Sequence, residues 1–286
     1  MIGMEVKKVG VLGAGAMGGG IALVAAQAGY DVVLSDIDLA FVDKALGWMG
    51  NFLSKSVEKG KITAEQKDAV LGRIARTTGV DEFGDVDMVI EAIIEDLQVK
   101  KDSFSQLDQV CKPEALLTTN TSSMSITQIA SSTKRPEQVA GLHFFNPAPI
   151  MKLVEIIRGY STSDDTVKIL TDVTVKFGKK PIVVKKDSPG FVVNRVMMAQ
   201  FIEAIKLVEE GVATPEDIDI AVKAGLNYPM GPFELQDFTG VDIGYHVANY
   251  FTDEFKDRRW NPPLPLKELI RAGRLGRKTG AGWYNY

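Results

Sequence analysis

The sequence predicts an α/β fold: a mostly parallel sheet with crossover helices, followed by an all-helical domain. Short apolar runs alternate with amphipathic helical segments from residue 7 to about residue 185, as expected where helices connect parallel strands. After residue 187 the apolar residues recur instead at spacings of three and four, which is the helical period. A length of 286 residues suits two domains of moderate size. We therefore expect a first domain over 1–187 and a second over 188–286.

The strands of the first domain are short continuous apolar runs, as in a sheet buried on both faces. Between the second and later strands lies a long charged helical stretch, about residues 38–70, with Gly60 as its break. An insertion of that length predicts a helical hairpin that projects from the sheet. The clearest strands are expected at 9–12, 31–36, 87–92, 116–120 and 139–145, with two more near 151–157 and 181–184.

The second domain begins after the segment Asp187-Ser188-Pro189-Gly190. A helix is predicted from Phe191 to Gly211, and the next begins at Thr214-Pro215, an N-cap residue followed by proline at the first helical position. Strand-like alternation returns only in the tail, Gly282–Tyr286. Several apolar residues of this domain look exposed, and internal packing explains only some of them: Met197, Met198, Phe201, Phe233, Leu235 and Phe238.

The composition excludes several classes of protein. Hydrophobic residues make up 45% and charged residues 24%, and the net charge is only −4, so nothing indicates a nucleic-acid partner. The absence of a long uncharged apolar segment argues against a membrane span. The single cysteine, Cys111, is expected to be a packed thiol rather than a nucleophile, and no metal site is predicted. The first strand starts within about eight residues, which predicts no signal peptide and a cytoplasmic protein.

A glycine-rich loop follows the first apolar run directly. It reads Gly13-Ala14-Gly15-Ala16-Met17-Gly18, and the next segment, Gly19 to Ala28, is predicted to be a helix. In such a loop the first glycine permits the turn, the second lets a pyrophosphate approach the backbone, and the third lets the helix pack closely. The amides at the start of the helix would face the phosphates. Strand, loop and helix together predict a Rossmann-type dinucleotide site.

The second strand ends in a carboxylate, Asp36, eighteen residues after Gly18. Such a group accepts hydrogen bonds from a ribose 2′-hydroxyl and repels a 2′-phosphate. No arginine lies nearby in the sequence to offset it, and the nearest cation is Lys44. We therefore expect the cofactor to be NAD rather than NADP.

Polar residues that directly follow strands are the candidates for chemistry, because ligands of open parallel sheets bind beyond the carboxyl ends of the strands. His143 suits a general base for hydroxyl-carbonyl chemistry, and Glu155, twelve residues later on the next predicted strand, could orient it. Ser122 and the amide of Asn194 could donate to a substrate oxygen. From spacing alone, a satisfied core histidine is the more common outcome, and Asn or Ser after a strand is most often a cap or a turn.

The motifs taken together resemble the L-3-hydroxyacyl-CoA dehydrogenase family, and in particular its short bacterial 3-hydroxybutyryl-CoA dehydrogenases. The resemblance covers essentially the whole chain, in order, and the segments HFFNP and PGFVVNR are specific to the family. The segments that carry it are GAGAMG, TNTSS, GLHFFNPAPIMKLVEII, DSPGFVVNR, YPMGPFEL and GRKTGAGWYNY.

The resemblance implies a role for each matching residue. His143 becomes the catalytic base and Glu155 its partner, while Ser122 contacts the substrate's 3-oxygen and Asn194 is the active-site asparagine. It further implies that acyl-CoA lies in the cleft between the domains and that the helical domain forms a homodimer. The cofactor residues implied are Gly13, Gly15, Ala16, Met17, Gly18, Asp36, Glu95, Lys100, Asn120, Ser122, Asn146 and Lys278.

Two lysines on the projecting hairpin, Lys55 and Lys59, are four residues apart and so share one helix face. Alone such a pair is usually a solvated surface; the resemblance makes it a contact for coenzyme A phosphates. Two other functions stay open at this point. The same fold and cofactor could act on a free hydroxy acid or sugar acid, or the protein could bind NAD without catalysis.

Overall fold

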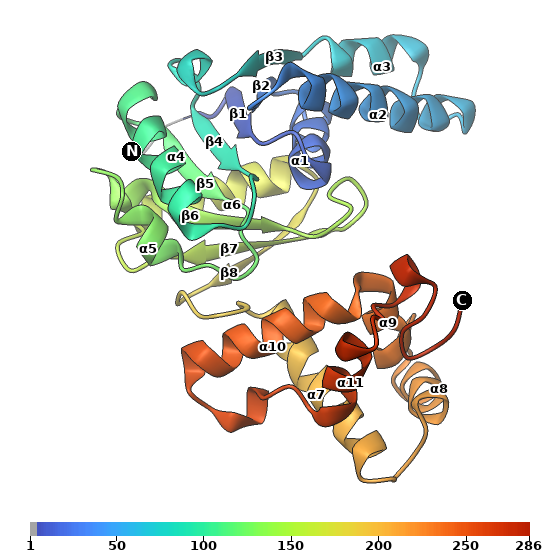
Figure 1. Cartoon of the computed structure of the whole chain (residues 1–286). Helices are drawn as coiled ribbons and strands as arrows, with labels where there is room; N and C mark the ends of the chain where they lie inside the picture. Colours follow the sequence, from blue (N-terminus) through green and yellow to red (C-terminus); the bar gives the residue numbers. More distant parts are fainter. Residues whose placement is uncertain (1–4) are drawn as a thin grey trace. The chain divides into compact units, whose positions relative to one another are not determined.

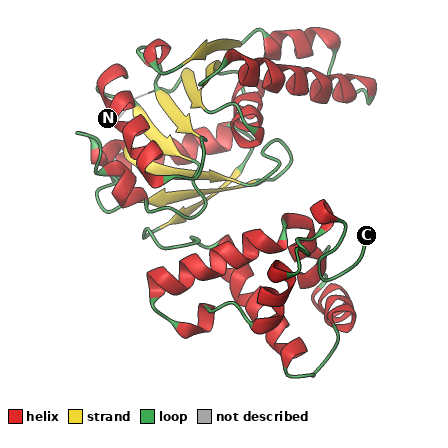
Figure 2. Ribbon diagram, viewed as in Figure 1, coloured by secondary structure: helices red, strands yellow, loops and turns green. Residues whose placement is uncertain are grey.

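The computed structural model describes residues 5–286 and divides into two compact units that meet between Ser188 and Pro189 (Figure 1). The first unit contains every strand of the described chain, and the second is helical (Figure 2). This confirms the predicted fold class.

The first unit is built on an eight-stranded sheet with the order β3-β2-β1-β4-β5-β6-β7-β8. Neighbouring strands are parallel except β6 and β7, which are antiparallel. The chain leaves β1 toward β2 and later returns to place β4 on the other side of β1, so the strand order reverses there. The strands are Lys8–Leu12, Asp31–Asp36, Ile74–Thr78, Met88–Glu91, Leu116–Thr119, Val139–Phe144, Leu153–Arg158 and Lys180–Val184.

Helices cover both faces of this sheet (Figure 1). On one face α1 (Ala16–Gln27), α2 (Leu39–Glu58) and α6 (Asp164–Lys176) enclose the main apolar core, to which β1, β2, β4, β6 and β7 contribute. On the other face lie α4 (Leu97–Val110) and α5 (Ile126–Ala130). Burial on both faces explains why most strands are continuous apolar runs rather than alternating ones.

The predicted projecting hairpin is present as α2 and α3 (Ala64–Leu71). Asp38 caps the start of α2, and Thr63 forms a capping box with Gln66 at the start of α3. Gly60 lies between the helices with a φ of +65°, a conformation that glycine adopts without strain. Local signals therefore determine both the ends of these helices and the turn between them.

Two elements differ from the prediction. Strand β3 is missing from it because this edge strand, with the sequence IARTT, has no buried residue and so no apolar run. Helix α1 begins at Ala16, three residues before the predicted start, because the glycine loop itself enters the helix. The last residues of the glycine loop thus form the first turn of α1.

The second unit packs around two apolar clusters. One gathers Met198, Phe201 and Phe251, and the other gathers Ile205 and Phe233. Three of the apolar residues that looked exposed in the sequence are therefore interior ones, whereas Phe238 is 60% exposed. The helices are α7 (Val193–Glu209), α8 (Pro215–Leu226), α9 (Pro232–Thr239), α10 (Val241–Phe255) and α11 (Leu264–Arg271).

The C-terminal tail is not a regular strand. It makes only two isolated bridges, from Ala281 to Gly276 and to Asn285. The buried carboxylate of Asp237 accepts hydrogen bonds from the backbone N–H groups of Trp283 and Tyr284, each at 2.9 Å. A side-chain carboxylate therefore replaces the neighbouring strand that the alternation implied.

Candidate active site

The glycine loop lies at the carboxyl end of β1, where the strand order reverses. Gly13 has a φ of +102°, and a Cβ there would lie 2.5 Å from the carbonyl oxygen of Ala92, so only glycine fits. A Cβ on Gly18 would lie 1.8 Å from the carbonyl oxygen of Gly13. A Cβ on Gly15 would meet nothing within 4 Å, so this exposed part of the loop has the space that a pyrophosphate needs. Ala16 and Met17 form the first helical residues behind it.

Asp36 lies at the end of β2 and is attached to the same loop. One carboxylate oxygen accepts a hydrogen bond from the N–H of Ala14 at 2.6 Å, and the other accepts one from Ile37 at 2.7 Å. These bonds fix the carboxylate beside the glycine loop while leaving further lone pairs for ribose hydroxyls. The arrangement fits an NAD adenosine, so the residues present suit that cofactor.

His143 and Glu155 face each other across the one antiparallel pair of strands. They are direct partners in the register of β6 and β7, and Nδ1 of His143 lies 2.7 Å from Oε2 of Glu155. The histidine is 5% exposed and the glutamate fully buried. A carboxylate at Nδ1 keeps the proton on that nitrogen and leaves Nε2 able to accept one. The pair thus has the geometry that a base and its orienting group require, and that role stays a prediction.

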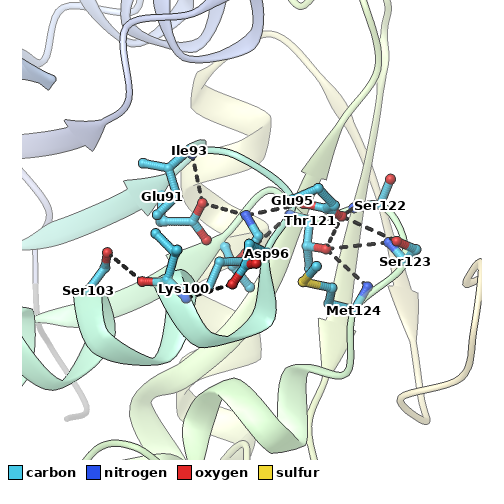
Figure 3. A network of polar contacts seen from close by, with 12 residues as sticks. Glu91, Ile93, Glu95, Asp96, Lys100, Ser103, Thr121, Ser122, Ser123 and Met124 are labelled. Carbon is cyan, nitrogen blue, oxygen red and sulfur yellow. Dashed lines mark hydrogen bonds and ion pairs between the residues drawn. The ribbon is translucent and has the colours of Figure 1, made fainter. Parts of the chain in front are cut away.

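Ser122 lies in the loop after β5, and this loop is organised by Glu95. One oxygen of the Glu95 carboxylate accepts hydrogen bonds from the hydroxyl of Thr121, from the N–H of Ser122 at 3.1 Å and from the hydroxyl of Ser123 at 3.3 Å (Figure 3). Glu95 itself comes from the segment between β4 and α4. A single carboxylate therefore ties together the ends of two neighbouring strands.

The carboxylate of Glu95 also forms an ion pair with Lys100. Its Nζ lies 3.2 Å from Oε2 of Glu95 and 2.6 Å from Oε1 of Glu91, and the lysine and Glu91 side chains are 1% and 0% exposed (Figure 3). Glu91 also accepts a hydrogen bond from the N–H of Ile93 at 2.8 Å. Lys100 is therefore a buried cation between two carboxylates. The family resemblance implies Lys100 only as a cofactor residue, and the sequence does not indicate Glu91 as its partner.

The electrostatics of Glu95 follow from these neighbours. Burial pushes the pKa of its carboxyl upward, but the charge of Lys100 and the hydrogen bonds from Thr121, Lys100 and Ser122 outweigh burial. The net result is a pKa below the ordinary value for glutamate. The group is therefore ionised near neutral pH, as an acceptor of several hydrogen bonds must be.

Asn120 and Asn146 follow strands β5 and β6. The side-chain oxygen of Asn120 accepts a hydrogen bond from the N–H of Phe144 at 2.8 Å, which joins the ends of those two strands. Asn146 is an exposed residue two positions beyond β6. The structure thus brings the Ser122 loop, Asn120 and the end of the His143 strand to one edge of the sheet.

The remaining predicted residues lie on the projecting hairpin and in the second unit. Lys55 is in the last turn of α2 and Lys59 is its C-cap, and both are exposed. In the second unit, Asn194 is in the first turn of α7. Nζ of Lys278 lies 2.6 Å from a carboxylate oxygen of Asp242, at the start of α10. The roles expected of these four residues, like those of the other predicted site residues, stay predictions.

A further polar anchor, Asp187, is missed by the sequence interpretation. Its carboxylate accepts hydrogen bonds from the hydroxyl of Ser125 at 2.7 Å and from the N–H of Thr127 at 2.9 Å. It therefore attaches the last residues of the first unit to the start of α5, just after the Ser122 loop. The Asp-Ser-Pro-Gly boundary is visible in the sequence, but no spacing rule predicts its partner sixty residues earlier.

A glycine loop at the point where strand order reverses, with a carboxylate at the end of the next strand, defines the class of dinucleotide-dependent dehydrogenases of the Rossmann type. Residues 8–188 match the model of the 3-hydroxyacyl-CoA dehydrogenase NAD binding domain, and residues 190–286 match the C-terminal domain of the same family. The chain belongs to the 3-hydroxyacyl-CoA dehydrogenase family.

Individual members of the family are similar to this chain over nearly its full length. The chain is 49% identical over 279 residues to a probable 3-hydroxybutyryl-CoA dehydrogenase from Deinococcus radiodurans, covering 98% of this chain and 100% of the relative. A solved (S)-3-hydroxybutyryl-CoA dehydrogenase from Ralstonia eutropha matches with a TM-score of 0.96 at 41% identity, covering 99% of both chains. A 3-hydroxybutyryl-CoA dehydrogenase structure from Escherichia coli K12 matches with a TM-score of 0.96 at 46% identity; this chain covers 60% of that longer one and is itself 99% covered.

No helix within residues 5–286 is both long enough and apolar enough to cross a membrane.

Proposed function

We propose that this protein oxidises an L-3-hydroxyacyl-CoA, with 3-hydroxybutyryl-CoA as the expected substrate, to the 3-ketoacyl-CoA with NAD, and catalyses the reverse reduction of acetoacetyl-CoA. The observation that carries the proposal is the buried contact between His143 and Glu155, at the sheet edge that also holds the Ser122 loop. Relatives named 3-hydroxybutyryl-CoA dehydrogenase, similar over nearly the whole chain, support the choice of substrate.

In the oxidation, Nε2 of His143 accepts the proton of the substrate's 3-hydroxyl group. Glu155 holds Nδ1–H and stabilises the imidazolium that forms. When bound, NAD would supply the acceptor for the hydride that leaves the same carbon, and this carbon would become a carbonyl. General base catalysis of this kind accelerates a reaction by about 10²–10⁴. Correct positioning of the reactants supplies much of the remaining rate acceleration.

The other residues orient the substrate and the cofactor. The hydroxyl of Ser122 is proposed to donate a hydrogen bond to the substrate's 3-oxygen, and the amide of Asn194 to act on the same substrate. The glycine loop and Asp36 hold the two ends of the cofactor's adenosine diphosphate. Lys278, Asn120 and Asn146 are proposed to contribute further cofactor contacts.

Lys55 and Lys59 are proposed to bind the phosphates of coenzyme A. Both side chains are exposed on the hairpin, and within residues 5–286 neither ammonium group makes a hydrogen bond or ion pair. An exposed, unneutralised pair of lysines is suited to an anionic ligand. A free hydroxy acid would leave this pair without a function.

The test is NADH oxidation by the purified protein with acetoacetyl-CoA, longer 3-ketoacyl-CoAs and a free 3-keto acid, with NADPH in parallel. We expect turnover with the CoA thioesters and NADH, and much less with NADPH or the free acid. Equal turnover of the free acid would support the hydroxy-acid function instead. No oxidation with any 3-ketoacyl-CoA would support a protein that binds NAD without catalysis.

We further infer a cytoplasmic homodimer assembled through the second unit. Several apolar side chains on that unit are exposed, including Val196 at 66%, Ile220 at 59% and Phe238 at 60%. The one cysteine, Cys111, is free and buried, which fits a reducing compartment. Sedimentation at several concentrations tests the dimer, and a monomer at all of them would contradict it.

A further inference from the structure

We propose that Trp48 on helix α2 stacks on the adenine of the CoA thioester and so helps to select a nucleotide-bearing substrate. The inference rests on the proposed function, because it assumes that the substrate carries coenzyme A. It assigns a binding residue for the base, whereas Lys55 and Lys59 concern only the phosphates.

Helix α2 has two distinct faces. Val42, Ala45, Met49 and Leu53 are buried against the core of the first unit. At 100° per residue, Phe41 and Trp48 lie on another side of the helix, and their side chains are 49% and 41% exposed. Other residues on the same side of the helix continue this surface along its whole length. We call it the aromatic-lysine stripe, and it consists of Phe41, Lys44, Trp48, Phe52, Lys55 and Lys59.

Trp48 is held within this stripe by Phe52. The centroids of the two rings lie 5.6 Å apart with an interplanar angle of 32°, and Phe52 also packs against the core cluster. The indole is therefore supported from below while much of its surface stays open to water. An exposed tryptophan on a rigid helix is a suitable platform for a nucleotide base, because every base has a flat π-face.

The lysines of the stripe carry positive charge that complements the phosphates of a nucleotide. Lys44, Lys55 and Lys59 are all exposed, and within residues 5–286 none of their ammonium groups makes a hydrogen bond or ion pair. The neighbouring acid Asp43 is already paired with Arg76 at 2.5 Å. The stripe thus combines a base platform with positive charge, the pairing that proteins use for phosphate-bearing bases.

The spacing along the helix also fits. At 1.5 Å per residue, Lys55 lies about 10 Å and Lys59 about 16 Å beyond Trp48 along the helix axis. Each lysine has a flexible four-carbon side chain. Its ammonium group can therefore reach back toward the phosphates of a nucleotide whose base stacks on Trp48. A base at Trp48 and phosphates toward Lys55 form a continuous site on one rigid element.

The experiment compares two substrates that differ only in the nucleotide: acetoacetyl-CoA and acetoacetyl-pantetheine. Stacking on an aromatic side chain predicts that Trp48→Leu raises the ratio of KM for the CoA thioester to KM for the pantetheine thioester by about 5- to 150-fold. Trp48→Phe keeps an aromatic face and should restore most of the wild-type ratio. Tyr160→Leu is the matched control, because Tyr160 is 92% exposed and lies outside the stripe; it should leave the ratio unchanged.

A second measurement uses adenosine 3′,5′-bisphosphate, which carries the base and the ribose phosphates without a thioester. We expect inhibition that is competitive with acetoacetyl-CoA and weaker in Trp48→Leu than in wild type. Inhibition competitive only with NADH would place the base at the cofactor loop and overturn the proposal. So would an unchanged KM ratio in Trp48→Leu, or an equal loss with both thioesters. If the wild-type protein turns over neither thioester, the proposed function itself fails.

Discussion

Nδ1 of His143 lies 2.7 Å from Oε2 of Glu155, and the two residues are direct partners in the register of neighbouring antiparallel strands. Because both backbones belong to one sheet, the distance between the side chains does not depend on a flexible loop. The contact is buried, so water does not compete for it. The orienting carboxylate is thus part of the rigid fold, which is what a base of fixed tautomer requires.

Glu155→Gln should lower kcat by about 10²–10⁴, because an amide at Nδ1 no longer fixes the proton there or stabilises the imidazolium. NADH affinity should change little, since the cofactor loop lies on other elements. Stopped-flow measurement of the hydride step, with NADH binding measured in parallel, checks both expectations. Wild-type kcat in this variant would show that Glu155 serves only in packing.

The buried ion pair behind Glu95 gives a prediction that separates stability from positioning. Lys100→Met leaves the carboxylate of Glu91 buried without its cation, which should reduce the free energy of unfolding by about 3–5 kcal/mol. The double variant Glu91→Gln/Lys100→Met removes both charges and keeps an acceptor for the N–H of Ile93, so it should recover much of that loss.

In the double variant, Glu95 still lacks the cation that holds it. We therefore expect a raised KM for NADH and a lowered kcat even where urea unfolding shows recovered stability. Lys100→Arg is a matched variant that retains the charge. Wild-type kinetics in the double variant would mean that Lys100 acts on stability alone.

How far the sequence predicts this molecule depends on how local each signal is. The glycine loop, strand β2 and the start of α8 at Thr214-Pro215 are local patterns and agree with the structure. Strand β3 is not predicted because it has no apolar run. It is stabilised by its pairing with β2. The tail alternates in hydrophobicity as a strand does, but the N–H groups of Trp283 and Tyr284 donate to the carboxylate of Asp237 instead of to another strand.

The candidate site divides in the same way. Glu155 can be selected as a partner for His143 because both lie on consecutive predicted strands. Glu91 cannot be selected as the partner of Lys100, because a glutamate at the end of a strand looks like any other polar terminus. Asp187 and its partners are separated by about sixty residues, and only the folded chain brings them together.

Asp36 should control the choice between NADH and NADPH. Asp36→Asn keeps an oxygen acceptor but removes the charge that repels a 2′-phosphate, so the preference for NADH should fall by about 5-fold or more. The variant Asp38→Asn, two residues away at the cap of α2, is the matched control and should leave the preference unchanged. Ratios of kcat/KM for the two cofactors measure the effect, and an unchanged ratio in Asp36→Asn would remove this residue from cofactor selection.

Cys111 should be unreactive in the folded protein. Burial raises the pKa of its thiol from 9.0 to about 11, so the thiolate population at pH 8 is about 100-fold smaller than in the unfolded chain. Labelling by iodoacetamide should be correspondingly slow, and its rate should rise with pH toward about 11 as the native thiol ionises. Labelling at pH 8 as fast as in denaturant would contradict this.

The most direct test of His143 as the general base is the rate of NADH oxidation with saturating acetoacetyl-CoA in the wild-type protein and in His143→Gln. We predict rapid turnover by the wild type and a kcat lower by about 10²–10⁴ in the variant, with NADH binding nearly intact. Full turnover by His143→Gln would contradict the proposed mechanism, because it would show that His143 is not the base.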